Sequence, residues 1–196
     1  MKKIIGLTGG SGAGKGEVLK CFKSLGAYTI DTDITYKNTV KSGMPALLEI
    51  KDEFGDGVIL ENGELNRKAL AKIVFNSDAL LHKLNEITHK YITEEIIKEI
   101  KDAKEKVVVI DAPALFESGI DKMCDKTVFV KADKKTRIER IMARDNLTET
   151  EAQERINAQK NDEFFIKACD FTIENNGRKD ELKGKVEQIL RVCIEN

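Results

Sequence analysis

Five short apolar runs recur along the chain and predict buried β-strands. Their β-branched content, and the helix-like segments that follow them, are typical of β-α units around a parallel sheet. The first unit is the clearest, because the residues from Gly9 to Gly14 predict a tight turn and the helical spacing over 17–25 stops at Gly26. The predicted strands cover residues 4–7, 27–30, 107–110, 127–130 and 171–173.

The long interval between the second and third predicted strands favours an inserted helical region. It holds more than 70 residues, too many for a simple crossover, and its apolar positions have helical spacing. Asn66 and Ser77 can each cap a helix in this region. We expect one apolar face on a long helix from four isoleucines, Ile92, Ile96, Ile97 and Ile100.

A second pair of helices is predicted between the last two strands. The segment 136–160 has helical spacing on both sides of a break near Asp145 and Asn146. After that break, Thr148 and Glu151 have the spacing of a capping box, in which each side chain satisfies a backbone N–H group. The pattern as a whole predicts an α/β protein with a parallel sheet and a large helical insertion.

Composition and charge restrict the class of partner. The 196 residues suffice for about one domain with a sizeable insertion, and 41% of them are hydrophobic. Thirty-three Lys and Arg residues balance thirty-four Asp and Glu residues, which gives a formal net charge of -1. Such a balance provides no general attraction to nucleic acid or to an anionic membrane surface. We therefore expect small-molecule ligands held by local features, and neither a nucleic-acid nor a membrane partner.

The cysteines and the apolar runs bear on the cellular compartment. No C-x-x-C pair or Cys/His cluster is present, so neither a zinc site nor a disulfide framework is predicted. No run approaches the roughly 20 apolar residues of a membrane span, and the start of the chain does not resemble a signal peptide. We expect a soluble cytoplasmic protein with four reduced thiols, Cys21, Cys124, Cys169 and Cys193.

A glycine-rich stretch behind the first strand almost matches a phosphate-binding loop. Gly9, Gly14 and Lys15 fit the pattern Gly-x-x-x-x-Gly-Lys, but the following hydroxyl residue is replaced by Gly16, and Glu17 comes next. The glycines allow consecutive N–H groups to surround a phosphate at a helix N-terminus, and the lysine adds positive charge. The alternative is a plain strand-to-helix turn, but the order of strand, loop and helix favours nucleotide binding. The nucleotide is therefore assigned to Gly10, Ser11, Gly12, Ala13, Gly14, Lys15, Gly16 and Glu17.

Three aspartates follow predicted strands. Asp31 and Asp33 come directly after the second strand, at the edge where open α/β sheets bind ligands. One of them could orient and deprotonate an attacking hydroxyl, although a helix cap or a turn is an equally ordinary use of aspartate. Asp111 ends the third strand, where a carboxylate that supports magnesium is expected, again with a turn residue as the alternative.

A basic helix and two histidines complete the candidates. The segment 131–144 holds six basic and two acidic residues, and Arg137, Arg140 and Arg144 share a helix face by spacing. Such a face is commonly just solvated, but phosphoryl transfer also uses arginines to neutralise charge. His82 and His89 are weak evidence for a metal. His89 is the more plausible substrate contact, whereas a structural role is favoured for His82.

These residues together resemble the dephospho-coenzyme A kinase family. The similar blocks are "GLTGG", "IDTD", "FGDGVILENGELNRKALAKIVF", "LNEITHKYI", "DAPALFESGID", "RDNLTETEAQERINAQ" and "ACDFTIENNG", in order and at similar spacing along the whole chain. The base-reading motif N-K-x-D of GTPases is missing. The resemblance implies that the γ-phosphoryl group of ATP is transferred, with Mg²⁺, to the ribose 3′-hydroxyl of dephospho-coenzyme A. It implies no protein partner.

The resemblance also implies an architecture and a set of roles. The fold would be a P-loop kinase-like three-layer α/β/α arrangement with a five-stranded parallel sheet, a helical substrate-binding insertion and a helical lid. The nucleotide-binding core would comprise 1–33, 104–136 and 168–196, the coenzyme A-binding insertion 34–103, and the lid 137–167. Asp33 would be the base and Arg140 a lid arginine, beside the roles already expected for Lys15 at the phosphates and Asp111 at the metal. Other substrate-side residues would be Thr8, Asp31, Lys37 and His89, with Asn175, Asn176 and Gly177 near adenine.

Several positions depart from the family pattern. Gly16 and Glu17 replace two hydroxyl residues, and Lys37 replaces an arginine, which keeps the charge but loses the bidentate fork. Lys90 stands in place of a proline and Ala114 in place of a leucine. The altered loop leaves two alternatives open: a protein that binds a nucleotide or coenzyme A without transferring phosphate, and another small-molecule kinase such as a nucleoside monophosphate kinase.

Overall fold

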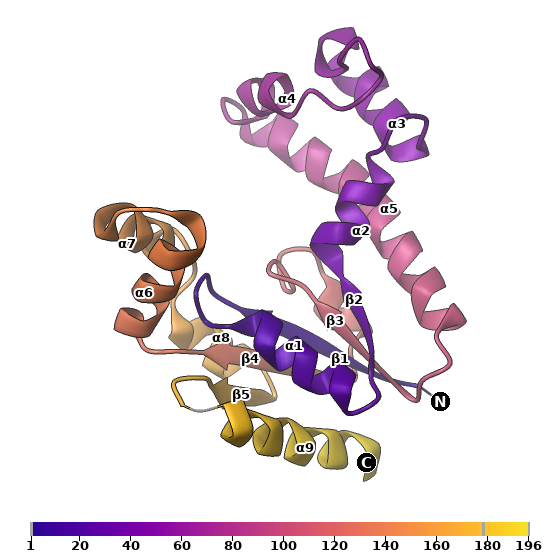
Figure 1. The fold of residues 1–196 in the computed structure, drawn as a ribbon. Coiled ribbons are helices and arrows are strands. Elements are labelled where there is room, and N and C mark those ends of the chain that lie inside the picture. The colour runs from indigo at the N-terminus through magenta and orange to yellow at the C-terminus, as the bar shows by residue number, and fades with distance from the viewer. Residues whose placement is uncertain (1, 178, 196) are drawn as a thin grey trace. The chain divides into compact units, whose positions relative to one another are not determined.

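The centre of the fold is a five-stranded parallel β-sheet (Figure 1). The computed structural model describes residues 2–177 and 179–195. The strand order is β2-β3-β1-β4-β5, so that the first strand lies in the middle. All five strands predicted from the sequence are present; four are slightly longer than expected and β2 is shifted by one residue: β1 Lys3–Gly9, β2 Tyr28–Asp31, β3 Val107–Asp111, β4 Lys126–Lys131 and β5 Phe171–Glu174.

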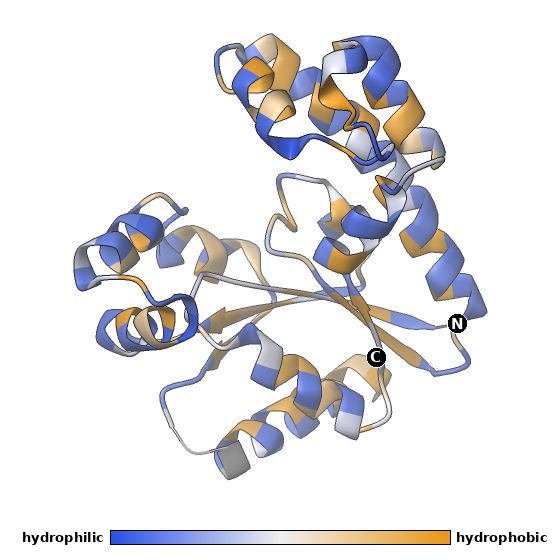
Figure 2. Cartoon of the chain, turned by 45° about the horizontal axis from the view of Figure 1, so that its top comes forward, coloured by the Kyte–Doolittle hydropathy of each residue, from blue (hydrophilic) through white to orange (hydrophobic). Residues whose placement is uncertain are grey.

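Helices cover both faces of this sheet, which confirms the three-layer expectation. On one face, α1 (Lys15–Ser24) and α9 (Lys179–Glu195) share an apolar core with β1, β3 and β4, in which Phe22 and Val186 are completely buried. Phe129 alternates with Val128 and Val130 along β4 and therefore points to the opposite face. There it stacks on Phe165 of α8 (Asp162–Ala168), with ring centroids 4.9 Å apart. The strands carry almost continuous hydrophobic colour, whereas the helices are striped (Figure 2).

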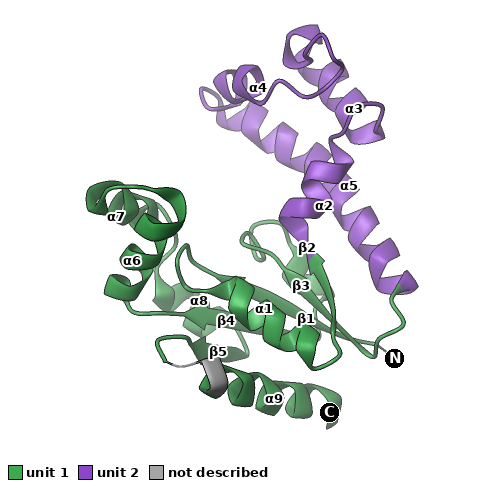
Figure 3. Cartoon of the chain, in the orientation of Figure 1, with its two compact units in different colours: residues 1–30, 103–196 green, residues 31–102 purple. Residues whose placement is uncertain are grey.

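The chain divides into two compact units (Figure 3). The first comprises residues 1–30 and 103–196 and contains the sheet core. The second comprises residues 31–102 and is helical. Its own apolar core includes Ile50 and Ile87, both almost fully buried. Its elements are α2 Thr32–Thr39, α3 Pro45–Phe54, the short 3-10 helix η1 Asp56–Val58, α4 Arg67–Val74 and α5 Asp78–Asp102.

The predicted caps of the second unit are present. The Asn66 side chain accepts a hydrogen bond from the Ala69 N–H group at 3.1 Å, and Ser77 Oγ accepts one from Leu80 at 3.4 Å. The isoleucine face of α5 is wrong in one position, because Ile96 is completely buried whereas Ile97 is 39% exposed. Adjacent residues lie about 100° apart around a helix, and Ile97 is turned away from the side on which Ile96 is buried.

The helices between β4 and β5 follow the predicted break. The first, α6 (Lys134–Asp145), ends at Asn146 in the left-handed conformation, with φ of 53°. The next, α7 (Glu149–Asn157), begins with the predicted capping box of Thr148 and Glu151. A third helix, α8, precedes β5 and was not predicted. A short 3-10 helix, η2, covers Ile120–Met123.

Two further features concern the cysteines and the helices. All four cysteines are free, and burial raises the pKa of the Cys124 thiol to about 12. Over residues 2–177 and 179–195, no helix combines the length and the apolar character needed to cross a membrane.

Candidate functional site: a phosphate-binding loop with converging arginines

The glycine-rich loop connects β1 to α1 in a conformation that depends on glycine. Gly12 and Gly14 have φ angles of 77° and 85°, in the left-handed region that side chains disfavour. Gly14 is the residue that precedes α1, so the loop ends at the positive N-terminus of that helix. The local geometry is therefore that of an anion-binding loop.

Lys15 and Asp111 are brought together at the edge of the sheet. Leu7 of β1 is the register partner of Asp111 in β3, so the loop that follows β1 begins beside the end of β3. The Lys15 ammonium group forms a hydrogen-bonded ion pair with Asp111 Oδ1, and the two side chains are 16% and 10% exposed. The lysine predicted to bind phosphate and the aspartate predicted to bind the metal are therefore in direct contact, and both are largely shielded from solvent.

Arg140 reaches the same loop from α6. Its Nη1 donates to the carbonyl oxygens of Gly12 and Ala13, each at 3.3 Å, and its Nη2 donates to the Asn175 carbonyl at 3.0 Å. The Asn175 side chain, which is buried, donates to the Ala13 carbonyl at 2.9 Å. Two residues predicted to act on the nucleotide therefore contact its loop, although the sequence did not indicate that they contact each other.

The three arginines of α6 do not behave alike. Arg137 is only 7% exposed and donates through Nε to the Ser11 carbonyl at 2.9 Å. Arg144 instead forms a bidentate pair with Asp145 at 2.8 Å and is largely exposed. The solvated-face interpretation therefore holds for Arg144 alone. Helix spacing places three arginines on one face, but only their distance from the loop decides which of them reach it.

Gln159 is a contact of the loop that the sequence did not reveal. Its Oε1 accepts a hydrogen bond from the Ser11 N–H group at 3.0 Å, and it also contacts Arg137. The residue lies between α7 and α8, 148 positions after Ser11, and no spacing rule connects the two. The family-like block "RDNLTETEAQERINAQ" contains it, but that resemblance assigns it no role.

Two other predicted residues have structural contacts. Thr8 is completely buried, and its hydroxyl donates to the Pro113 carbonyl at 3.3 Å; its place beside a substrate remains a prediction. Asn176 Oδ1 accepts a hydrogen bond from the Asp133 N–H group at 2.8 Å, which ties the turn after β5 to the start of α6. Gly177 follows in the same turn, and the adenine contact of this turn remains a prediction.

The altered end of the loop is open to solvent. A Cβ atom at Gly16 would meet nothing within 4 Å, and the Gly16 φ angle is not in the left-handed region. Glu17 Oε1 accepts a hydrogen bond from Lys20 Nζ at 2.8 Å, one turn further along α1. The Glu17 carboxylate is therefore directed toward a lysine, which partly balances the charge that would otherwise repel a phosphate.

The residues at the loop suit one particular kind of magnesium site. Asp111 supplies a carboxylate, whereas Gly16 supplies space but no oxygen ligand. Across residues 2–177 and 179–195, no group of three or more His, Cys, Asp or Glu could hold a metal. This set does not fit an all-protein metal cage. It does fit magnesium that keeps water and phosphate oxygens as most of its ligands.

The aspartates of the second unit have different environments. Asp31 caps α2: its Oδ1 accepts hydrogen bonds from the N–H groups of Asp33 and Ile34 at 2.9 and 3.1 Å. Asp33 is exposed in the first turn of α2. The alternative of a helix cap is therefore realised at Asp31, and Asp33 has the more accessible carboxylate of the two.

Lys37 lies in a groove of the second unit with a volume of about 490 Å³. Two other cations, Lys41 and Arg67, line it together with Glu64, which leaves a positive excess. Arg67 is held over the Tyr36 ring, with its guanidinium carbon 5.1 Å from the centroid. The rest of the lining consists of Val40, Ser42 and Leu65.

The two histidines of α5 differ in burial. His89 is half-buried, and burial lowers the pKa of its imidazole, which favours the neutral form at pH 7. A neutral imidazole can donate through one nitrogen and accept through the other. His82 is exposed and lies 3.5 Å from Glu86 on the next turn, a surface contact that agrees with the structural role predicted for it.

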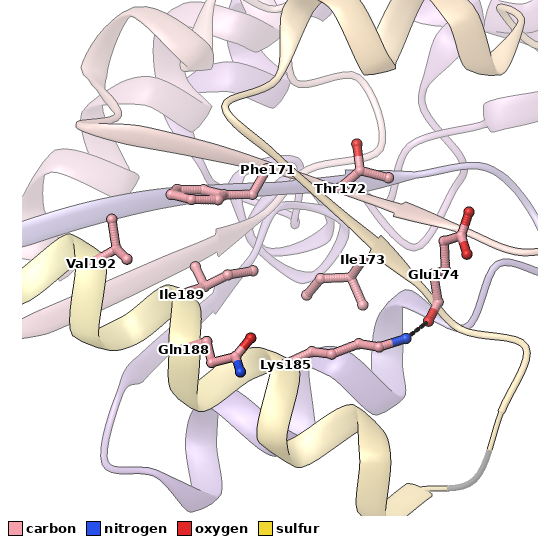
Figure 4. Close-up of a pocket in the computed structure, with 8 residues that line it drawn as sticks. All are labelled: Phe171, Thr172, Ile173, Glu174, Lys185, Gln188, Ile189 and Val192. Atoms are coloured by element: carbon pink, nitrogen blue, oxygen red, sulfur yellow. Dashed lines mark hydrogen bonds between the residues drawn. The ribbon is translucent and has the colours of Figure 1, made fainter.

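A second groove of about 490 Å³ lies between β5 and α9 (Figure 4). Its wall is mainly apolar, and Lys185 Nζ donates across it to the Glu174 carbonyl at 2.8 Å. None of the site residues predicted from the sequence lines this groove.

Comparison with known proteins agrees with the loop chemistry. A family model described as dephospho-CoA kinase matches residues 3–181. The dephospho-CoA kinase of Bacillus licheniformis is 36% identical over 193 residues, which cover 97% of this chain and 96% of that protein. The dephospho-CoA kinase of Fusobacterium nucleatum is 40% identical over 191 residues, which cover 94% and 95%.

Three solved structures are similar to this chain along its length. A protein from Thermus thermophilus has a TM-score of 0.83 at 29% identity, over 97% of both chains. The dephospho-CoA kinase from Campylobacter jejuni has a TM-score of 0.69 at 25% identity, over 97% of this chain and 96% of that one. A shikimate kinase from Acinetobacter baumannii, with a TM-score of 0.52 at 15% identity, is similar in fold alone.

Proposed function

The chain belongs to the dephospho-CoA kinase family and phosphorylates the ribose 3′-hydroxyl of dephospho-CoA with ATP, and we propose that Lys15, Arg140 and Asp33 carry out this transfer. One observation carries the proposal: a cationic lysine and a lid-segment arginine converge on a single anion-binding loop. Phosphoryl transfer requires mainly positioning and charge stabilisation, which such an arrangement supplies.

The phosphate side of the reaction falls to the loop and its cations. The loop amides and the N-terminus of α1 bind the phosphates, and Lys15 exchanges part of its pairing with Asp111 for the β- and γ-phosphates. Arg140 neutralises charge that develops on the transferring group. The arginine needs no long approach, because its guanidinium already lies 3.3 Å from two loop carbonyls.

The acceptor side falls to the second unit. Asp33 accepts the proton of the ribose 3′-hydroxyl while the 3′-oxygen forms a bond to the γ-phosphorus. The bond between that phosphorus and the β,γ-bridging oxygen breaks, which releases ADP. Its exposure leaves the carboxylate accessible to a substrate. His89 serves as a neutral polar contact. The basic groove at Lys37, Lys41 and Arg67 suits the diphosphate of dephospho-CoA, whose charge the three cations can offset.

Magnesium and the cellular setting complete the proposal. Asp111 would hold the metal through its carboxylate or a bound water, and the ion would neutralise phosphate charge. The substrates are small molecules, ATP and dephospho-CoA, and no protein partner is required. The setting is the cytoplasm, where the thiols stay reduced.

The test is a coupled ADP-release assay with dephospho-CoA. We expect Lys15→Ala to abolish turnover because the lysine acts on phosphate charge, and to remain folded with a lower melting temperature because Asp111 loses its partner at a largely desolvated position. Lys23→Ala, at the far end of α1, is the matched control and should stay active. Full turnover by Lys15→Ala would contradict the assigned site. ATP binding by the wild type without ADP release would instead identify a binding protein.

A further inference from the structure

The three polar groups of Ser11 form hydrogen bonds with two side chains from distant parts of the chain. Gln159 Oε1 accepts a hydrogen bond from the Ser11 N–H group at 3.0 Å, and Gln159 Nε2 contacts Ser11 Oγ at 3.3 Å. Arg137 Nε donates to the Ser11 carbonyl at 2.9 Å. The amide, the hydroxyl and the carbonyl of one loop residue are therefore all bound by the pair Arg137 and Gln159.

The pair is also held together. Arg137 Nη2 donates to Gln159 Oε1 at 3.0 Å, and Arg137 Nη1 lies 3.3 Å from Asp162 Oδ1. Burial lowers the pKa of the Arg137 guanidinium, and the Asp162 carboxylate opposes that effect. A buried, multiply bonded guanidinium is costly to reorient. Arg137 is thus a fixed support, on which the exposed Gln159 side chain rests.

The glycines on either side of Ser11 make room for this pair. A Cβ atom at Gly10 would lie 2.3 Å from Arg137 Nη2 and 3.0 Å from Gln159 Oε1. A Cβ atom at Gly12 would lie 2.5 Å from the Arg137 carbonyl oxygen, and Gly12 has a positive φ angle as well. A side chain at Gly12 would meet the Arg137 backbone, whereas a side chain at Gly10 would displace the Arg137 and Gln159 side chains from their places.

We propose that Gln159 is a positioning residue for the nucleotide phosphates, acting through Ser11 and supported by Arg137. A phosphate-binding loop works only when its peptide groups are oriented before the ligand arrives, since ordering them on binding weakens the affinity. Gln159 fixes the peptide group that precedes Ser11 through its N–H, and Arg137 fixes the peptide group that follows Ser11 through its carbonyl oxygen. The proposal rests on the proposed function only in taking loop 9–17 as the ATP site.

The first experiment removes the carboxamide. Gln159→Leu keeps a side chain of similar size but breaks the contacts with Ser11 and Arg137. We expect the ATP dissociation constant, measured by calorimetry, and the KM for ATP to rise about three- to tenfold, the range for losing one or two exposed hydrogen bonds. The KM for dephospho-CoA and the melting temperature should not change. Gln188→Leu, at an exposed glutamine of α9, is the matched control and should change none of these values.

A double-variant cycle tests whether Arg137 and Gln159 act on ATP affinity together or independently. Arg137→Lys keeps the charge but cannot reach both Ser11 and Gln159, so the Arg137→Lys, Gln159→Leu double variant should lose less ATP affinity than the product of the two single effects. If Arg137→Lys does not fold, Gly10→Ala replaces it in the cycle, because a Cβ there displaces the same two side chains.

The results decide between the proposal and its failure. An unchanged ATP dissociation constant in Gln159→Leu, or single effects that multiply in the cycle, would overturn it. A change in KM for dephospho-CoA equal to that for ATP would also overturn it, since that points to general distortion. Failure of the proposed reaction is distinguishable, because it appears as ATP binding by the wild type with no release of ADP.

Discussion

The replacement of a hydroxyl residue by Gly16 leads to a quantitative prediction about magnesium. A serine at this position would place an oxygen where phosphate-binding loops supply a metal ligand. The site has room for it, because a Cβ atom there would meet nothing within 4 Å and the φ angle is not in the left-handed region. Gly16→Ser should therefore introduce the ligand without strain.

The expected gain can be divided between the two altered positions. One restored charge-assisted contact is worth roughly 1.5 to 3 kcal/mol, which corresponds to about tenfold to a hundredfold if it acts mainly in the transition state. Glu17 is already paired with Lys20 at 2.8 Å, so its charge is partly balanced. We therefore expect Gly16→Ser alone to give most of the gain, and the added Glu17→Thr change to give little more.

The assay measures ADP release against free magnesium at saturating dephospho-CoA. Gly16→Ser should raise turnover and move the half-saturating magnesium concentration downward relative to the wild type. Gly184→Ser is the matched control, because it makes the same change at another open helical position, in α9. Coinciding curves for wild type and Gly16→Ser, with substantial activity in both, would refute the reasoning and show that another group supplies the ligand.

Three further predictions concern the second unit. Asp33→Asn should remove most of the activity and leave the calorimetric affinity for ATP nearly intact; an equal loss of ATP affinity would assign Asp33 to the nucleotide instead. Lys41→Glu should raise the KM for dephospho-CoA about tenfold or more by reversing one charge in the basic groove, with Lys68→Glu on α4 as control, and unchanged kinetics would remove the groove from the substrate site. Asn66→Ala should lower the free energy of unfolding in urea by about 1 kcal/mol through loss of the α4 cap, and identical unfolding curves would show that the cap contributes nothing.

The sequence by itself determined those features that depend on neighbouring residues. Strands, helix ends and caps are set by side chains within a few positions of one another, as at Asn66, which bonds to Ala69, and at Thr148, which bonds to Glu151. The phosphate-binding loop also belongs here, because the left-handed angles of Gly12 and Gly14 are a local property of glycine. The resemblance of ordered motifs added the family, which comparison with known proteins confirms.

Only the tertiary structure decided which distant side chains meet. Ser11 bonds to residues 126 and 148 positions away, and their contact depends on how α6 and the turn after α7 fold back onto the loop. Spacing alone could not separate Arg137, which is buried against the loop, from Arg144, which is solvated. The burial of Thr8 and the exposure of Ile97 were hidden for the same reason. The local pattern determines the direction of a side chain relative to its own helix or strand. The residues that it contacts are determined by the distant segments of the chain that pack against that helix or strand.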